Sequence, residues 1–196
     1  MSEQRRHQRI RFGKSPTIKI GYDGELGGGT VENLSLSGFM VRTAVPLEVG
    51  KNFGCEFSVF GSSKIDVAAV TVSRLGDLYG ARFQAGPISE VLIKDAIANA
   101  VASGQASTVN VHTENGRKIM RIAGGLTGSL YNDFYYSLTK MGIDELDLSA
   151  VTYVDEEGIR LCSKAVARYG ATIGAQSECF AVAWQNLKRR HGALED

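Results

Sequence analysis

The segment Val70–Phe83, with the sequence VTVSRLGDLYGARF, decides the fold of the first half of the chain. Apolar residues stand at nearly alternate positions on both sides of Gly76-Asp77, and a dipeptide of this kind between two such runs indicates a β-hairpin. The alternation also occurs upstream, in Phe53–Val59 and in Ile65–Val67. Short runs of this kind occupy residues 16–84 with almost no helical pattern, so we expect about six strands in a small antiparallel barrel.

Residues 88–103 change to a helical period. We expect a helix that ends near Gly104, because glycine is a common helix stop. Over residues 87–105 this helix would link a barrel domain of residues 1–86 to a second domain of residues 106–196. The residues expected on one face of the helix are Val91, Leu92, Asp95, Ala96, Asn99 and Ala100.

From residue 108 the pattern alternates between strands and helices. A hairpin turns at Glu114–Gly116, and Ser177 is expected to cap a last helix that runs to about Arg190. Strands separated by helices of ~12 residues predict an α/β sandwich, so the whole chain is expected to be an α+β protein of two domains. The other expected elements are a helix at 129–140, a strand at 145–149, a helix at 158–169 and a strand at 171–175.

The composition restricts the range of functions. A chain of 196 residues with a formal net charge of +1 has no overall field to attract DNA or an acidic membrane, so we expect no nucleic-acid partner. No apolar run approaches the ~20 residues that span a bilayer, and the polar residues 1–6 predict no secretory signal. We therefore expect a cytoplasmic protein without membrane insertion. Buried free thiols are expected at Cys55, Cys162 and Cys179.

Four arginines lie within the seven residues Arg5–Arg11. The guanidinium fork of arginine can bond a phosphate or the O6/N7 edge of guanine with two donors, and its plane stacks on a base. The segment has no hydrophobic period, so a solvated basic tail is the alternative interpretation.

A second polar motif follows in Val31–Leu36, where the residues alternate. Asn33 and Ser35 should point to one side and Leu34 and Leu36 to the other, so we expect an amide and a hydroxyl on one exposed face of a strand. Gly38 would be required if the backbone turns sharply or a ligand comes close. An ordinary turn is the alternative, because asparagine, serine and glycine all favour turns.

Together the two motifs resemble the PilZ domain family, whose signature is Arg-x-x-x-Arg followed by (Asp/Asn)-x-Ser-x-x-Gly. The matching segments here are Arg5–Arg9 and Asn33–Gly38. The resemblance covers about residues 3–86 and includes the glycine at Gly50 and the closing strand Tyr79–Phe83. Either motif alone is weak evidence, but both in order on a barrel-like pattern are specific.

The resemblance implies a six-stranded barrel that binds cyclic di-GMP. Arg5 and Arg9 would clamp guanine edges and phosphates, Asn33 and Ser35 would hydrogen-bond a guanine, and Gly38 would keep the loop close to the ligand. Arg6 and Arg11 are extra to the motif and are not ranked as its core contacts. The candidate ligand-binding residues are Arg5, Arg6, Arg9, Asn33, Ser35 and Gly38.

A third motif, within residues 146–159, resembles the STAS domain of anti-sigma-factor antagonists, and that resemblance extends over about residues 106–190. Where the family has a phosphorylatable serine, this chain has Glu156. A kinase–phosphatase switch of that type is therefore in doubt. Asp155 is expected to cap the following helix, with Glu156 and Glu157 favourable in its first turn. This loop could alternatively be a protein-docking surface held in one charge state.

We therefore expect a cyclic di-GMP receptor that signals to an unidentified protein partner, through the STAS-like half or through other contacts of the barrel. No nucleophile–base pair, metal-ligand spacing or cofactor motif stands out, so we expect neither an enzyme nor a metal site. A nucleotide-independent interaction module, similar to an anti-sigma-antagonist scaffold, is the main alternative. An enzyme in the second half and a DNA-binding arm are weaker alternatives.

Overall fold

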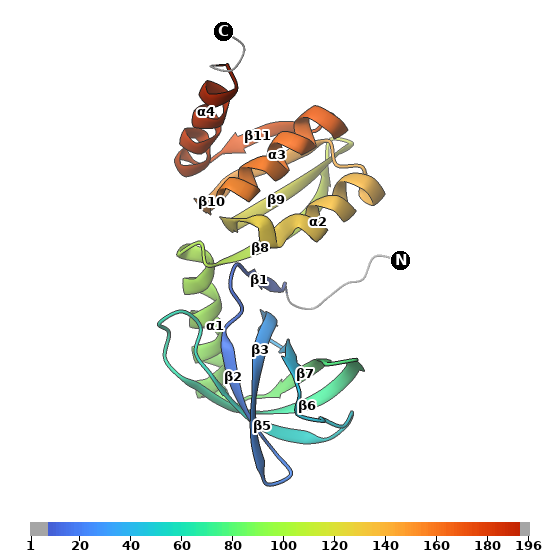
Figure 1. Ribbon diagram of the computed structural model, residues 1–196, viewed down its shortest axis with the longest axis vertical. Coiled ribbons are helices and arrows are strands. Elements are labelled where there is room, and N and C mark those ends of the chain that lie inside the picture. The colour runs from blue at the N-terminus through green and yellow to red at the C-terminus, as the bar shows by residue number, and fades with distance from the viewer. Residues whose placement is uncertain (1–7, 193–196) are drawn as a thin grey trace. The chain divides into compact units, whose positions relative to one another are not determined.

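The computed structural model describes residues 8–192 and contains two compact units, residues 1–100 and 101–196 (Figure 1). The elements of the first unit are β1 (Ile10–Phe12), β2 (Thr17–Tyr22), β3 (Glu25–Ser35), β4 (Gly38–Thr43), β5 (Asn52–Phe57), β6 (Ile65–Leu75) and β7 (Leu78–Gln84), followed by α1 (Pro87–Ala102).

Six of these strands close into a barrel. Around the ring, β3 pairs with β2, β2 with β5, β5 with β6, β6 with β7, β7 with β4, and β4 again with β3, and every pairing is antiparallel. The short strand β1 adds to the outside of the ring by pairing with β3. The predicted six-stranded antiparallel barrel is therefore confirmed, and closure leaves none of its six strands as a free edge. Its interior includes Ile18, Ile20, Val31, Leu34, Phe39, Val41, Phe53, Phe57 and Tyr79.

The predicted hairpin at Gly76-Asp77 joins β6 to β7, and Gly76 has a positive φ of 62°, which glycine adopts without steric cost. The two alternating runs before this hairpin, Ile65–Val67 and the run from Val70, belong to a single strand of 11 residues, β6. The pairing of β6 with β7 shifts between Thr71 and Ser73, so Val72 is an extra residue in β6. Such a bulge sharpens the local twist and helps a small sheet to close.

The helix α1 forms close to its predicted limits, but its buried face differs from the expected one. Ile93, Ala96 and Ala100 are buried, whereas Val91 is 56% exposed. The expected set contained polar residues and shared only Ala96 and Ala100 with the observed face. A helix in which apolar residues surround the axis gives a poor signal for which side is buried.

The second unit is a four-stranded sheet with helices. Its strands are ordered β8-β9-β10-β11, with an antiparallel β8–β9 hairpin and parallel pairings of β9 with β10 and of β10 with β11. Its elements are β8 (Ala106–Glu114), β9 (Arg117–Leu126), a short 3₁₀ turn (Gly128–Leu130), α2 (Tyr131–Tyr136), a π-helical turn (Ser137–Met141), β10 (Glu145–Val154), α3 (Glu156–Tyr169), β11 (Thr172–Gln176) and α4 (Glu178–Gly192).

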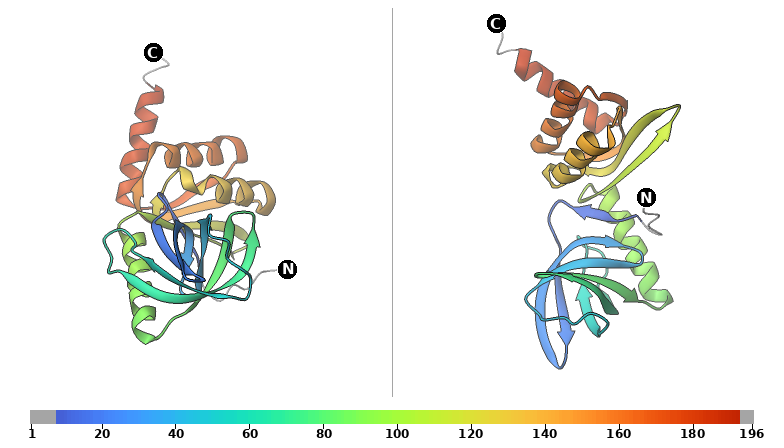
Figure 2. Two further views of the ribbon diagram at one scale, coloured as in Figure 1. Left: turned by 60° about the horizontal axis from the view of Figure 1, so that its bottom comes forward. Right: turned by 90° about the vertical axis from the view of Figure 1, so that its right-hand side faces the viewer.

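One hydrophobic core holds this unit together. Side chains of β9 and β10 pack with Phe134 of α2, Cys162 of α3 and Phe180 of α4, so these helices share the core of the sheet. Figures 1 and 2 show α2 and α3 over the same face of the sheet. Ser177 accepts a hydrogen bond from the Phe180 amide at 3.2 Å, which confirms the predicted cap of the last helix.

The three cysteines are all free, but only Cys55 and Cys162 are buried; Cys179 is exposed. The expectation of three buried thiols was therefore wrong at Cys179, which lies in the first turn of α4. Burial raises the pKa of both Cys55 and Cys162 to about 12, and at Cys55 the nearby Asp66 carboxylate adds to this effect.

These thiols should differ sharply in reactivity with a disulfide reagent. At pH 8 a thiol with a pKa of about 12 is a thiolate in only about one molecule in ten thousand, and the thiolate is the reactive form. We expect Ellman's reagent to modify one thiol per chain quickly, and all three after unfolding in guanidinium. Cys179→Ser should abolish the fast reaction; rapid modification of the folded variant would contradict the assignment.

Candidate functional site

A bulge in β3 places the polar motif on the outer face of the barrel. The pairing of β3 with β4 shifts between Val31 and Asn33, so Glu32 is an extra residue in β3. In a regular strand Val31 and Leu34 would lie on opposite faces, yet both are fully buried, because the extra residue reverses the alternation. Asn33 and Ser35 consequently point to the outside of the barrel.

Both side chains are nonetheless withdrawn from solvent, so the expected exposed position was wrong. Asn33 and Ser35 are each only 3% exposed. β3 pairs with β1 along one edge and with β4 along the other, so both residues lie inside the sheet and not at its border. Periodicity shows which face a residue occupies, but it does not show what lies beside that face.

The two buried groups differ in how their hydrogen-bonding capacity is used. Ser35 Oγ donates a hydrogen bond of 2.9 Å to the Gly38 carbonyl, which ties the end of β3 to the start of β4. Asn33 Oδ1 accepts no hydrogen bond within the described part of the chain. A buried acceptor without a donor costs about 1–3 kcal/mol. The site therefore gains stability from any ligand that brings a donor to Asn33.

Gly38 is required by the barrel itself. A Cβ added at this residue would lie 2.1 Å from the Ala81 carbonyl oxygen of β7, far inside van der Waals contact. The sequence suggested a glycine here because a ligand comes close. The structure gives a second reason, the close approach of the β4 and β7 backbones. Its lack of a side chain also keeps the surface flat beside Ser35.

The arginine motif is described only in part. Arg5 and Arg6 lie outside the described residues. Arg9 is exposed and immediately precedes β1, whose Arg11 pairs with Asn33. The same register, continued by one residue, brings Arg9 opposite Ser35. Side chains of paired residues point to the same face of a sheet. Arg11 is extra to the sequence motif, and no local signal in the sequence reveals that its strand, β1, lies beside β3.

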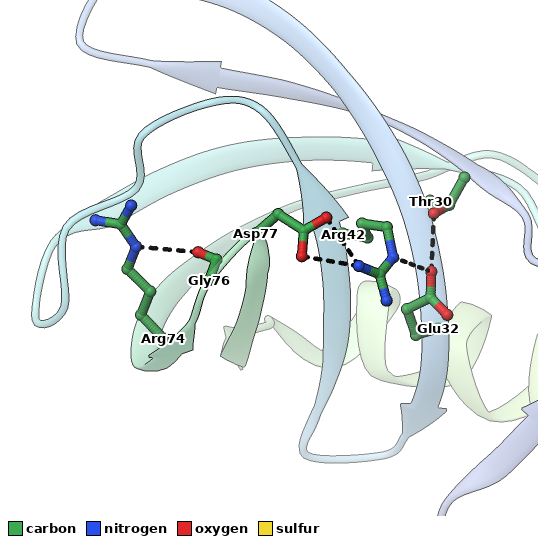
Figure 3. Close-up of polar contacts among 6 residues, drawn as sticks. All are labelled: Thr30, Glu32, Arg42, Arg74, Gly76 and Asp77. Carbon is green, nitrogen blue, oxygen red and sulfur yellow. Dashed lines mark hydrogen bonds and ion pairs between the residues drawn. The ribbon is translucent and has the colours of Figure 1, made fainter.

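Arg42, in contrast, has a structural role (Figure 3). Its Nη1 donates to both carboxylate oxygens of Asp77 at 2.8 Å, and its Nε lies 3.4 Å from Glu32 Oε1. This guanidinium holds the pKa of the Asp77 carboxyl below its ordinary value through the side-chain hydrogen bond. The network connects β3, β4 and the β6–β7 turn, so this arginine is already engaged by carboxylates.

The third motif forms the predicted helix start in the second unit. Asp155 caps α3 by accepting a 2.7 Å hydrogen bond from the Gly158 amide, as expected. Arg160 pairs with Glu157 at 2.5 Å and with Glu156 at 2.8 Å, so one guanidinium offsets part of the negative charge of the two glutamates.

A groove of about 750 Å³ lies beside this helix start, between α3 and α4. Val154, Ile159, Ala183 and Leu187 line it with apolar atoms. Arg160 and Lys164 add positive charge to its lining, and Asp155 and Glu156 add negative charge. Within residues 8–192 no three His, Cys, Asp or Glu side chains are grouped so as to hold a metal ion. No helix in the same range is both long and apolar enough to cross a bilayer.

The family assignment follows from the barrel half of the chain. The PilZ domain family matches residues 3–102, which is about half of the chain and includes α1. The chain therefore belongs to the PilZ domain family. The match ends at residue 102, so the resemblance of residues 106–190 to STAS domains stays a prediction.

Several solved structures are similar to the chain over this half. The PilZ domain with c-di-GMP of YcgR from Escherichia coli is 18% identical, with 50% of this chain and 91% of that chain covered at a TM-score of 0.44. The K. pneumonia MrkH–c-di-GMP complex is 14% identical, with 52% and 54% covered at a TM-score of 0.46. PlzA of Borreliella burgdorferi in complex with c-di-GMP is 20% identical, with 48% and 41% covered at a TM-score of 0.37. This chain thus spans about half the length of the MrkH and PlzA chains. No curated protein matches the chain.

The backbone contact at Gly38 leads to a stability prediction. Gly38→Ala should lower the free energy of unfolding by at least about 2 kcal/mol without any ligand, because its Cβ meets a backbone carbonyl that cannot move aside cheaply. Chemical denaturation followed by circular dichroism measures this change.

Gly54→Ala is the matched control for this substitution. Its added Cβ would meet nothing closer than the Gly21 carbonyl oxygen, at the ordinary distance of 3.9 Å. We expect it to unfold like the natural protein. A Gly38→Ala variant of unchanged stability would show that the glycine does not separate β4 from β7.

Proposed function

We propose that this protein is a cyclic di-GMP receptor whose ligand lies on the outer face of the barrel at Asn33 and Ser35. The observation that carries the proposal is the buried Asn33 Oδ1, which lacks a donor among residues 8–192. Guanine presents N–H donors on its Watson–Crick edge, and one of them would satisfy this oxygen. The bound state would then recover the free energy that the unpaired acceptor costs.

The remaining candidate residues have complementary roles in this proposal. Arg5, Arg6 and Arg9 supply guanidinium forks for guanine O6/N7 edges and for the two phosphates of the ligand. Ser35 holds the β3–β4 connection in the geometry that aims Asn33, through its bond to the Gly38 carbonyl. Gly38 keeps the two strands close.

Calorimetric titration of cyclic di-GMP into the full chain tests this function. We expect saturable binding by the natural protein. Arg9→Ala should weaken it by at least about tenfold, since a hydrogen bond to a charged group contributes about 1.5–3 kcal/mol. Ser35→Ala should also weaken it, because it removes the bond to the Gly38 carbonyl that aims Asn33. Asn33→Leu, which keeps a similar volume without an acceptor, should weaken it as well.

Arg74→Ala is a suitable control for loss of positive charge. Arg74 lies near the β6–β7 turn, where its Nε donates to the Gly76 carbonyl, and it takes no part in the proposed site (Figure 3). Its affinity should match that of the natural protein. Absence of binding by a folded, nucleotide-free sample would refute the receptor function and leave a nucleotide-independent interaction module.

We further propose that the receptor is cytoplasmic, has no catalytic activity, and signals by changing its contacts with a protein partner. The STAS-like second unit is the proposed output surface. Its α3 start, with the Asp155 cap and the apolar groove beside Ile159, offers a fixed surface at which a partner could dock. Because Glu156 cannot accept a phosphate, control would come from the ligand rather than from a kinase. Such control requires the ligand to bind one arrangement of the chain more tightly than the other.

Hydrogen exchange of backbone amides tests the relay. Cyclic di-GMP should slow exchange around residues 31–40, and it should also change exchange around residues 154–160 if the second unit responds. The Ser35→Ala variant is the control; at a ligand concentration too low to occupy its weakened site, it should show neither change. Ligand-dependent changes confined to residues 8–102 would contradict an output through the second unit.

A further inference from the structure

Strand register brings residues from distant parts of the chain into two rows on the outer face of the barrel. The first row runs from Arg11 in β1 through Asn33 and Met40 to Gly80 in β7. The second row runs from Ser35 through Gly38 to Arg82 in β7. Since paired residues project to the same side of a sheet, all of them share the face of Asn33.

Two positions at the centre of this face are glycines. Gly38 and Gly80 flank the half-buried Met40 in the two rows. An added Cβ at Gly80 would lie 2.4 Å from Ser73 Oγ, and one at Gly38 would meet the β7 backbone, so neither position has room for a side chain. Between them lies a thioether, which makes favourable contacts with aromatic rings. We call this stretch of Gly38, Met40 and Gly80 the glycine floor, and Met40 is its only long side chain.

Two exposed arginines border the floor at opposite edges. Arg11 in β1 and Arg82 in β7 are three inter-strand spacings apart, roughly 14 Å at about 4.8 Å per spacing. Both are exposed, and side chains stand approximately perpendicular to a sheet, so their guanidinium groups rise along the two edges. Arg82 has no ion pair or hydrogen bond within residues 8–192, unlike Arg42, whose guanidinium is held by Asp77 and Glu32.

We propose that Arg11 and Arg82 are additional ligand-binding residues, and that cyclic di-GMP lies across β3 and β4 between them. This inference rests on the receptor function proposed above. Arg11 would bind the ligand beside Asn33 and near the arginines of the N-terminal arm, Arg5, Arg6 and Arg9. Arg82 would bind a phosphate or guanine edge of the ligand from the far side of the glycine floor. The barrel itself, and not only the N-terminal arm, then supplies guanidinium forks.

The test is a calorimetric titration of cyclic di-GMP into full-length Arg11→Ala, Arg82→Ala and Arg82→Lys, with Arg74→Ala as the charge-matched control. Both exposed alanine variants are expected to fold, which circular dichroism checks. We expect each alanine variant to bind about tenfold more weakly or worse, the difference made by one good charge-assisted bond. Arg82→Lys should remain weakened, because lysine keeps the charge but loses the fork.

Three outcomes would overturn the inference in distinguishable ways. In the first outcome, Arg9→Ala and Ser35→Ala lose binding while Arg11→Ala and Arg82→Ala keep their affinity within about twofold. That change is well below the loss of one charge-assisted hydrogen bond, so the receptor function stands and this inference fails. If Arg82→Lys binds as tightly as the natural protein, or if Arg74→Ala binds more weakly than it, general positive charge rather than the guanidinium fork accounts for the effect. If the natural protein does not bind at all, both the receptor function and this inference fail.

Discussion

The extra residue Glu32 in β3 is the constraint on which the proposed site depends. Without it, the alternation that buries Val31 would continue, and Asn33 and Ser35 would point into the barrel while Leu34 faced outward. An amide and a hydroxyl inside a small apolar barrel would cost several kcal/mol of desolvation. The bulge keeps Leu34 in the core and turns the polar motif toward the face where we propose that the ligand binds.

The placement of Asn33 also explains why a stable barrel can keep a binding-ready group. Strand closure fixes the backbone on both sides of β3, so the acceptor at Asn33 Oδ1 is held in place by the fold rather than by a partner of its own. A preorganised acceptor loses little conformational entropy when a donor arrives. The unpaired state is tolerated because the whole barrel contributes to its stability, and the proposed ligand would remove the cost.

The local features of the fold could be predicted from the sequence. Turn residues such as Gly76-Asp77, the Ser177 cap and the Asp155 cap act over a few residues, and the structure has all three where they were expected. The non-local features could not. Which strand lies beside β3 decides that Arg11 faces Asn33, and the pairing of Gly38 with Arg82 joins positions far apart in the chain.

The candidate site was likewise predictable only in its composition. The motif residues Asn33, Ser35 and Gly38 were identified from spacing, but the burial of Asn33 and Ser35 was not. The bulge that orients them shows in the sequence only as two successive polar residues, Glu32 and Asn33, between Val31 and Leu34. The exposed Cys179 illustrates the same limit, because apolar neighbours in sequence do not guarantee a covered position in a helix. Register and neighbour identity are properties of the closed barrel and the packed sheet, not of any short segment.

The most direct test of the central claim is a crystal structure of the full chain with cyclic di-GMP. We expect a guanine on the outer face of the barrel with one of its N–H groups within hydrogen-bonding distance of Asn33 Oδ1, and the ligand extending over Gly38 toward Arg82. A ligand bound elsewhere, with Asn33 Oδ1 still lacking a donor, would contradict it.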